Sequence, residues 1–135
     1  MPSATIIPVL AYADVRGAVE WLCRCFGFAE RLRIGDHRSQ LMFGDGCVVV
    51  TRGTAEDGST ATAATHSVML RVADVDAHYL RAADAGVLVA SLPASHPYGE
   101  RQYTAIDIGG HAWTFSQSIS DVDPASWGGE LFDDA

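Results

Sequence analysis

The sequence contains no lysine, so all nine of its basic side chains are arginines. A chain without lysine can form no lysine Schiff base and cannot hold a nucleotide phosphate with a P-loop lysine. Basic side chains are also outnumbered, because 17 aspartates and glutamates give a formal net charge of -8. Nucleic-acid binding normally requires the opposite balance. We therefore expect no nucleic-acid partner.

Cysteine and long apolar runs are scarce as well. The three cysteines are an odd number, and Cys23 and Cys25 lie two residues apart, where helical side chains diverge, so no disulfide framework is expected. No apolar run approaches the roughly 18 residues that cross a bilayer, and the first residues lack the positive charge of a secretion signal. These absences predict a cytoplasmic protein with free thiols and no membrane partner.

The first half of the chain predicts a strand, a helix and three further strands. An apolar stretch at 6–12 is followed by Asp14, which can cap a helix whose apolar residues recur at helical spacing until Gly27. Strand-like stretches follow at 29–34, 39–43 and 47–52, and a Gly-Asp-Gly turn at 44–46 joins the last two. The small polar residues after 53 then predict a flexible linker.

The same order of elements repeats after the linker. A predicted strand at 66–72 is followed by a helix from Val75 to Gly86 and by strands at 87–90, 102–107 and 112–117. The triplet Ala-Asp-Val at 13–15 recurs at 73–75, which favours a duplication. We predict an α+β domain over residues 1–118, made of two βαβββ modules at 5–53 and 66–118 joined by the linker 54–65. The modules are expected to form a cupped eight-stranded mixed sheet with helices on its outer face and a cavity within.

Residues 119–135 form an acidic C-terminal tail. The tail carries five of the acidic side chains and no arginine, so residues 1–118 hold 12 acids and nine arginines, a net charge of only -3. It also contains Trp127, Leu131 and Phe132, which suit either a segment docked on a partner subunit or a frayed end. Because the excess of acid lies in the tail, the total charge says little about the cavity.

Three segments carry a recognisable pattern: IIPVLAYADVRGAVEWLCRCFGF, HSVMLRVADVDAHYLRAADAG and YGERQYTAIDIGGHAWTFSQS. Together they resemble the vicinal oxygen chelate superfamily, which includes glyoxalases, extradiol dioxygenases and bleomycin-resistance proteins. The third segment is similar to the family's Asp-Pro-x-Gly-His-x-Trp-x-Phe signature, with Ile108 where proline is common. The resemblance covers residues 5 to 118 and implies the predicted fold and a homodimer. It leaves the reaction open, because the superfamily hosts lyases, isomerases, dioxygenases, thiol transferases and binding proteins.

The resemblance also implies where a metal would bind. Metal-dependent members place histidine or glutamate on the first and last strand of each module. The corresponding residues here are Ile7, Val49, Ser67 and Thr114, and none of them can hold a catalytic divalent ion. We therefore expect no metal and no other cofactor. His66, next to Ser67, would reach the inner face only through a one-residue shift or a bulge.

Alternation along the strands assigns the side chains that line the predicted cup. The candidates on the inner face are Val49, Thr51, Ser67, Met69, Arg71, Thr114 and Ser116, with His37 and Gln40 as further polar candidates. The segment 98–103 adds Tyr98, Arg101 and Tyr103, which offer aromatic faces and a guanidinium for an anionic group. An alternative stays open in which Arg101 pairs with a nearby acid and the tyrosines fill gaps between loop and sheet. Trp113 is expected in the core.

These residues favour a metal-independent protein that binds a small organic molecule and resembles the bleomycin-resistance branch. Such a protein would sequester a drug or metabolite and act in antibiotic resistance. The alternative is a lyase, isomerase or dioxygenase of the same superfamily, in which His66, Glu100 and Arg101 would supply a base and an anion clamp. A third hypothesis is a partner-binding module that docks through its tail. The sequence assigns no catalytic residue.

Overall fold

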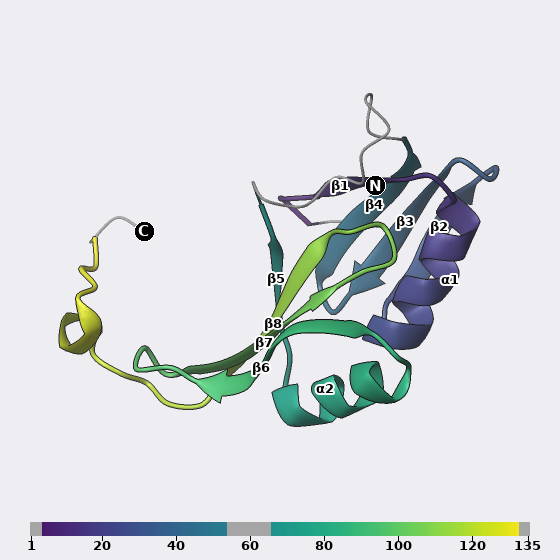
Figure 1. Cartoon of the computed structure of the whole chain (residues 1–135). Coiled ribbons are helices and arrows are strands. Elements are labelled where there is room, and N and C mark those ends of the chain that lie inside the picture. Colours follow the sequence, from purple (N-terminus) through teal and green to yellow (C-terminus); the bar gives the residue numbers. More distant parts are fainter. Residues whose placement is uncertain (1–3, 54–65, 133–135) are drawn as a thin grey trace.

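The computed structural model describes residues 4–53 and 66–132 (Figure 1). The elements follow the predicted order: β1 (Val9–Tyr12), α1 (Val15–Phe26), β2 (Ala29–Ile34), β3 (Arg38–Phe43), β4 (Gly46–Arg52), β5 (Val68–Arg71), α2 (Val75–Asp84), β6 (Leu88–Ser95), β7 (Glu100–Ile106), β8 (Ala112–Ser118) and the short 3-10 helix η1 (Pro124–Trp127). The predicted α+β class with two repeats of strand, helix and three strands is confirmed.

The eight strands divide between two four-stranded mixed sheets. The first has the order β1-β4-β3-β2 and the second the order β5-β8-β7-β6. Strand β1 runs parallel to β4, and β5 runs parallel to β8, whereas the remaining pairs are antiparallel. The sequence led us to expect one cupped sheet of eight strands, whereas within the described residues each module forms a separate hydrogen-bonded sheet.

Both helices begin at the predicted caps and α1 ends at Gly27 as predicted, whereas α2 ends at Asp84, two residues before the predicted Gly86. The Asp14 carboxylate accepts a hydrogen bond from the Gly17 amide at 3.0 Å, and the equivalent Asp74 accepts one from the Ala77 amide at 3.1 Å. Gly27 ends α1 in the left-handed conformation with φ 90°, which a residue with a Cβ adopts only at a cost. The two aspartates are therefore helix caps, as the sequence indicated.

Strand β6 is longer than predicted. It continues to Ser95, although the sequence predicted a strand only at 87–90. Its register against β7 shifts twice, between Val89 and Ser91 and between Ser91 and Ala94, so apolar and polar residues do not alternate along it. The strand also contains Pro93, which an edge strand tolerates because one row of its amides has no partner strand.

The helix-covered faces of the two sheets share one core. Phe26, at the end of α1, contacts Phe115 and Trp113 of β8, with ring centroids 4.9 and 5.8 Å apart. All three side chains are fully buried, so the first module closes over residues of the second. Such aromatic side chains bury large apolar areas and therefore contribute strongly to the stability of the shared core.

Hydrogen bonds also join the two modules. The buried Asp107 carboxylate, in the turn after β7, accepts hydrogen bonds from the Tyr12 hydroxyl of β1 at 2.5 Å and from Trp113 Nε1 at 2.9 Å. It also accepts the backbone amides of Gly109 and His111, both at 2.9 Å. Four donors thus satisfy a carboxylate that is only 6% exposed. The signature aspartate therefore holds the first strand of one module against the last turn of the other.

The imidazole of His78 makes a second polar connection between the modules. His78, on α2, stacks on Phe115 with ring centroids 4.0 Å apart. Its Nε2 lies 2.8 Å from the Phe26 carbonyl oxygen, and its Nδ1 lies 2.5 Å from the Tyr103 hydroxyl. The carbonyl can only accept, so Nε2 carries the hydrogen and Nδ1 accepts from the tyrosine. Burial lowers the pKa of His78, which keeps the ring neutral in this arrangement.

None of the helices formed by residues 4–53 and 66–132 has the length and apolar character needed to span a membrane.

Candidate ligand-binding faces

One face of the second sheet carries no helix, and it collects several of the predicted site residues. Met69 lies opposite Thr114, and Arg71 lies opposite Ser116. Met69 is 59% exposed, whereas Phe115, one position along β8 from Thr114, is fully buried. Because side chains alternate along a strand, these four side chains share the uncovered face. Ser67 immediately precedes β5 and is also exposed.

A chain of hydrogen bonds fixes the polar side chains on this face. The Tyr98 hydroxyl donates to Gln102 Oε1 at 3.0 Å, and Gln102 Nε2 donates to Ser116 Oγ at 3.0 Å. Ser116 Oγ in turn donates to Glu100 Oε1 at 2.8 Å. The Met69 sulfur lies 4.0 Å from Gln102 Nε2. The row therefore presents preoriented donors and acceptors beside an exposed thioether, a combination suited to an organic ligand.

The carboxylate at the end of this row is ionised at neutral pH. Hydrogen bonds from Ser118 and then Ser116 lower the pKa of Glu100, with a smaller contribution from the positive charge of Arg71. An ionised carboxylate can only accept hydrogen bonds. Glu100 therefore orients the Ser116 hydroxyl and, through it, the side-chain amide of Gln102.

An open surface pocket of about 480 Å³ adjoins the same row. It lies between the β6–β7 turn and the start of the tail, and its walls are formed by Tyr98, Glu100 and residues 118–122. The tail is attached at this place because the amides of Ile119 and Ser120 both donate to the Gly99 carbonyl oxygen. The first residues of the acidic tail thus contribute to the candidate site, which the sequence did not indicate.

The uncovered face of the first sheet holds the remaining candidates from that module. Val49 lies between Val9 and Gln40, and Thr51 lies between Ala11 and Arg38. Val49 and Gln40 are buried, whereas Val9 is 56% exposed. His37, in the turn before β3, is exposed. The predicted pair Val49 and Thr51 thus lies with Gln40 on one face, as alternation indicated.

The structure separates Arg101 and Tyr103 from the other candidates. Both alternate with Gln102 along β7 and therefore point to the helix-covered side. The Arg101 guanidinium donates to both oxygens of Asp76 in the first turn of α2, and Tyr103 is only 1% exposed beneath that helix. Arg101 thus pairs with an acid, the alternative that the sequence left open. A ligand on the uncovered face cannot touch either side chain.

Two residues of the face escaped the sequence analysis. Gln102 pairs with Ser116, and Thr104 pairs with Thr114, to which its hydroxyl is hydrogen-bonded at 2.9 Å. The alternation of side chains along β7, with Thr104 placed opposite Thr114 of β8, could have identified both residues. The sequence analysis instead assigned Tyr98, Arg101 and Tyr103 to the site.

The three residues of the enzyme hypothesis, His66, Glu100 and Arg101, do not lie close together. The His66 ring lies near His111, 6.3 Å between centroids, where β8 begins. Glu100 pairs with Ser118 at the other end of β8, about 20 Å away at the usual rise per strand residue. Arg101 points to the opposite side of the sheet. These three residues therefore cannot act on one substrate atom within a single chain.

The donor chemistry of the family's metal positions does not fit a divalent ion. Val49 and Thr114 lie on the uncovered faces, and Ile7 and Ser67 just precede β1 and β5, so the four positions offer no imidazole or carboxylate. Within the described part of the chain, no three histidine, cysteine, aspartate or glutamate side chains gather in a group that could hold a metal. These four positions therefore supply no ligand set for a catalytic divalent ion.

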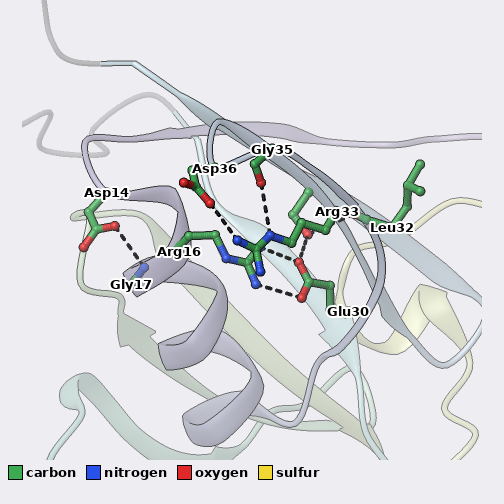
Figure 2. A network of polar contacts seen from close by, with 9 residues as sticks. Asp14, Arg16, Gly17, Glu30, Leu32, Arg33, Gly35 and Asp36 are labelled. Atoms are coloured by element: carbon green, nitrogen blue, oxygen red, sulfur yellow. Dashed lines mark hydrogen bonds and ion pairs between the residues drawn. The ribbon is translucent and has the colours of Figure 1, made fainter.

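The helix-covered side of the first sheet carries a network of ion pairs (Figure 2). Arg16 of α1 donates to both oxygens of Glu30, at 2.7 and 2.9 Å, and Ser39 adds a third hydrogen bond to that carboxylate. These contacts, the one from Arg16 being the strongest, lower the pKa of Glu30 to about 2. At the edge of the sheet, Arg33 pairs with Asp36 at 2.7 Å. Arg16 and Arg33 are thus each paired with an acid of the same module.

Comparisons with known proteins agree with the geometry. The family model described as Glyoxalase/Bleomycin resistance protein/Dioxygenase superfamily matches residues 6–115. The solved structure of TioX from Micromonospora sp. ML1 is 35% identical, with a TM-score of 0.70 over 89% of this chain and 100% of that one. No curated protein sequence matches the chain.

Two more distant structures share the fold. One is the bleomycin-binding protein of bleomycin-producing Streptomyces verticillus in complex with copper(II)-bleomycin, which is 20% identical with a TM-score of 0.65 over 90% of this chain and 99% of that one. The other is the fosfomycin resistance protein FosX from Listeria monocytogenes, 15% identical with a TM-score of 0.69 over 87% and 94% of the two chains.

Proposed function

This chain belongs to the glyoxalase/bleomycin resistance protein/dioxygenase superfamily, and from that membership we propose that it is a metal-independent protein that binds a small organic molecule. The observation that carries the proposal is the hydrogen-bonded row from Tyr98 through Gln102 and Ser116 to Glu100, beside the exposed Met69. Such a row orients a ligand through directional polar contacts, while the thioether and the sheet surface contribute apolar area.

Sequestration of a drug or metabolite is the role that we propose for this binding. Similar folds include a protein solved with copper(II)-bleomycin and a fosfomycin resistance protein. In this chain, the side chains at the family's metal positions are apolar or hydroxylic and therefore suit contact with a ligand better than coordination of an ion. Val49, Thr51, Ser67, Met69, Arg71, Tyr98, Thr114 and Ser116 remain the proposed contacts, now with Gln102 and Thr104.

We also propose that the protein acts as a homodimer in the cytoplasm. The uncovered sheet faces expose Val9 and Met69 by more than half, and a second copy placed over them would enclose a ligand and bury this apolar surface. The three cysteines are free, as is usual for a reducing compartment. Light scattering coupled to size-exclusion chromatography would test the dimer directly.

The central experiment measures ligand binding by the full chain and by two charge-introducing variants. Native mass spectrometry of untagged protein is used to find a co-purified compound and to measure bound metal. Thermal unfolding is then followed with that compound, with copper(II)-bleomycin and with fosfomycin. A compound present at 100 times its Kd should stabilise the fold by about 2.7 kcal/mol. Met69→Glu should abolish this stabilisation, because it places a charge in the apolar part of the site.

Leu80→Glu is the matched control. Leu80 is 64% exposed on α2, away from both uncovered faces, so the same change of charge there should leave ligand stabilisation intact. Stoichiometric zinc, nickel, iron or manganese in the untagged protein would contradict metal independence. The binding proposal fails if no compound co-purifies and none stabilises the protein, or if Met69→Glu binds as well as Leu80→Glu.

A further inference from the structure

Two arginines lie on the uncovered face of the first sheet. Arg38 of β3 pairs with Thr51, whose side chain is on that face, and Arg31 of β2 donates through Nη1 to Gln40 Oε1 at 2.7 Å. Arg31 is also close enough to Cys47, on the same face, to oppose the rise that burial causes in the pKa of that thiol. Both guanidinium groups therefore belong to the candidate ligand-binding face and not to the helix-covered side.

Neither guanidinium is neutralised by the described part of the chain. The ion pairs among residues 4–53 and 66–132 are those of Arg16, Arg33 and Arg101, and none involves Arg31 or Arg38. Three acids of the first module have other partners: Asp14 caps α1, Asp36 pairs with Arg33, and Glu30 binds Arg16 on the opposite side of the sheet. The uncovered face of the first sheet is thus locally cationic in a protein whose net charge is -8.

The repeat shows that the fold does not require a cation at this position. Arg38 lies opposite Thr51 of the last strand in the first sheet, and Gln102 lies opposite Ser116 of the last strand in the second. Gln102 is therefore the counterpart of Arg38, and a neutral side chain occupies the same place in the same βαβββ architecture. A positive charge that the architecture does not need is more readily explained by something that binds to it.

Apolar side chains surround the two arginines. Leu32 lies opposite Gln40, and Ile34 lies opposite Arg38, so both are on the uncovered face, where they are 41% and 39% exposed. Val9 adds a further exposed aliphatic side chain on β1. The face thus combines forked cationic donors with an apolar surface, which matches a molecule that has one anionic group on an apolar body.

We propose that the uncovered face of the first sheet recognises an organic acid, with Arg31 and Arg38 holding its carboxylate, phosphonate or sulfonate and Val9, Leu32 and Ile34 contacting its apolar part. This inference rests on the proposed small-molecule binding and specifies the chemical class of the ligand. The acidic, apolar tail of a second copy is the other anionic occupant that the chain itself could offer, and the experiment distinguishes it.

The test compares two probes that differ only in charge. Naphthalene-2-carboxylate and the neutral naphthalene-2-carboxamide are titrated into the full chain at low salt and followed by calorimetry. A charge-assisted hydrogen bond should make the acid bind about tenfold more tightly than the amide. Arg38→Gln, which installs the side chain found at the counterpart position, should reduce that difference without changing amide binding, because Arg31 alone then contacts the anion.

Arg33→Gln is the matched control, because it deletes one arginine from the neighbouring strand β2 on the opposite, helix-covered side of the same sheet. Arg33 pairs with Asp36 at the exposed edge, so its loss should leave the preference for the acid unchanged. Equal binding of acid and amide would overturn the inference while leaving small-molecule binding intact. Failure of both probes, when other compounds still stabilise the protein, would also overturn it. A shift of the monomer–dimer equilibrium in Arg38→Gln without acid binding would assign the face to the tail of a second copy.

Discussion

Replacement of Tyr12 by phenylalanine tests the hydrogen bond that joins the two modules. The Tyr12 hydroxyl lies 2.5 Å from Asp107 Oδ2, and the two side chains belong to residues 95 positions apart that are only 3% and 6% exposed. Tyr12→Phe keeps the ring and removes only the donor. The variant therefore reports on this bond with little change in packing.

The expected loss can be worked out from the surroundings of Asp107. Hydrogen bonds to charged groups contribute about 1.5–3 kcal/mol. Because Trp113 and two backbone amides still donate to the carboxylate, the loss should lie near the lower end, about 2 kcal/mol. At about 2.1 cal/mol/K per residue, a domain of this length would show a fall in Tm of about 7 °C.

Alkaline pH supplies a second readout for the same bond. Burial, followed by the negative charge of Asp107, raises the pKa of Tyr12 above its ordinary value of 10.0. A group whose pKa is higher in the folded state contributes stability that is fully present below its unfolded pKa and is lost as the pH rises above it. The wild-type protein should therefore lose stability above about pH 10, and Tyr12→Phe should lose less of it.

Calorimetry or circular dichroism on three proteins completes the test. Tyr98→Phe is the control, because its hydroxyl bonds to Gln102 at the exposed end of the second sheet and its loss should cost less than about 0.5 kcal/mol. Equal Tm values for Tyr12→Phe and Tyr98→Phe would refute a role for the Asp107 hydrogen bond in holding the modules together. An alkaline profile unchanged by Tyr12→Phe would refute the pKa argument.

Two further predictions concern stability at acidic pH. Burial lowers the pKa of His78, so the neutral ring contributes stability that is present above the unfolded pKa of about 6.5 and is lost as the pH falls below it. NMR titration should place the midpoint of His78 under 6.5, and a midpoint at or above 6.5 would contradict the assignment of its hydrogen bonds. Glu30 has a pKa of about 2 and therefore contributes stability above its ordinary 4.5 that is lost as the pH falls toward 2. Arg16→Gln should raise that pKa by about 1–3 pH units, measured by NMR, while Arg24→Gln, at the other end of α1, should leave it unchanged.

Local patterns predicted the elements and the faces correctly where their causes are local. The Asp14 and Asp74 caps, the left-handed Gly27 and the alternation that places Met69 and Thr114 on one face all depend on contacts within a turn or between adjacent strands. Such contacts recur at fixed spacings and can be seen in a sequence. The same alternation would have identified Gln102, had it been counted from β8.

The choice among arginines could not be made from the sequence. Arg101 is near aromatic residues in the chain and was predicted to clamp an anion, yet it meets Asp76 on the helix-covered side. Arg31 and Arg38 were not among the predicted site residues, yet they lie on the uncovered face and form no ion pair with an acid of the described residues. Whether a guanidinium is matched depends on which carboxylates the packing brings near, and these can be tens of residues away.

By itself, the sequence determined the duplicated order of elements, the starts of both helices and the family, because repeats, caps and motifs depend on neighbouring residues. Only the tertiary structure decided that the strands form two sheets, that Asp107 joins β1 to the last turn through Tyr12, and that the start of the acidic tail lies beside Glu100. These outcomes depend on strand register and on packing between modules, which bring together groups whose separation along the chain carries no local signal. The chain without lysine thus places two arginines, and not the acids that dominate its composition, on one of the faces where a ligand would bind.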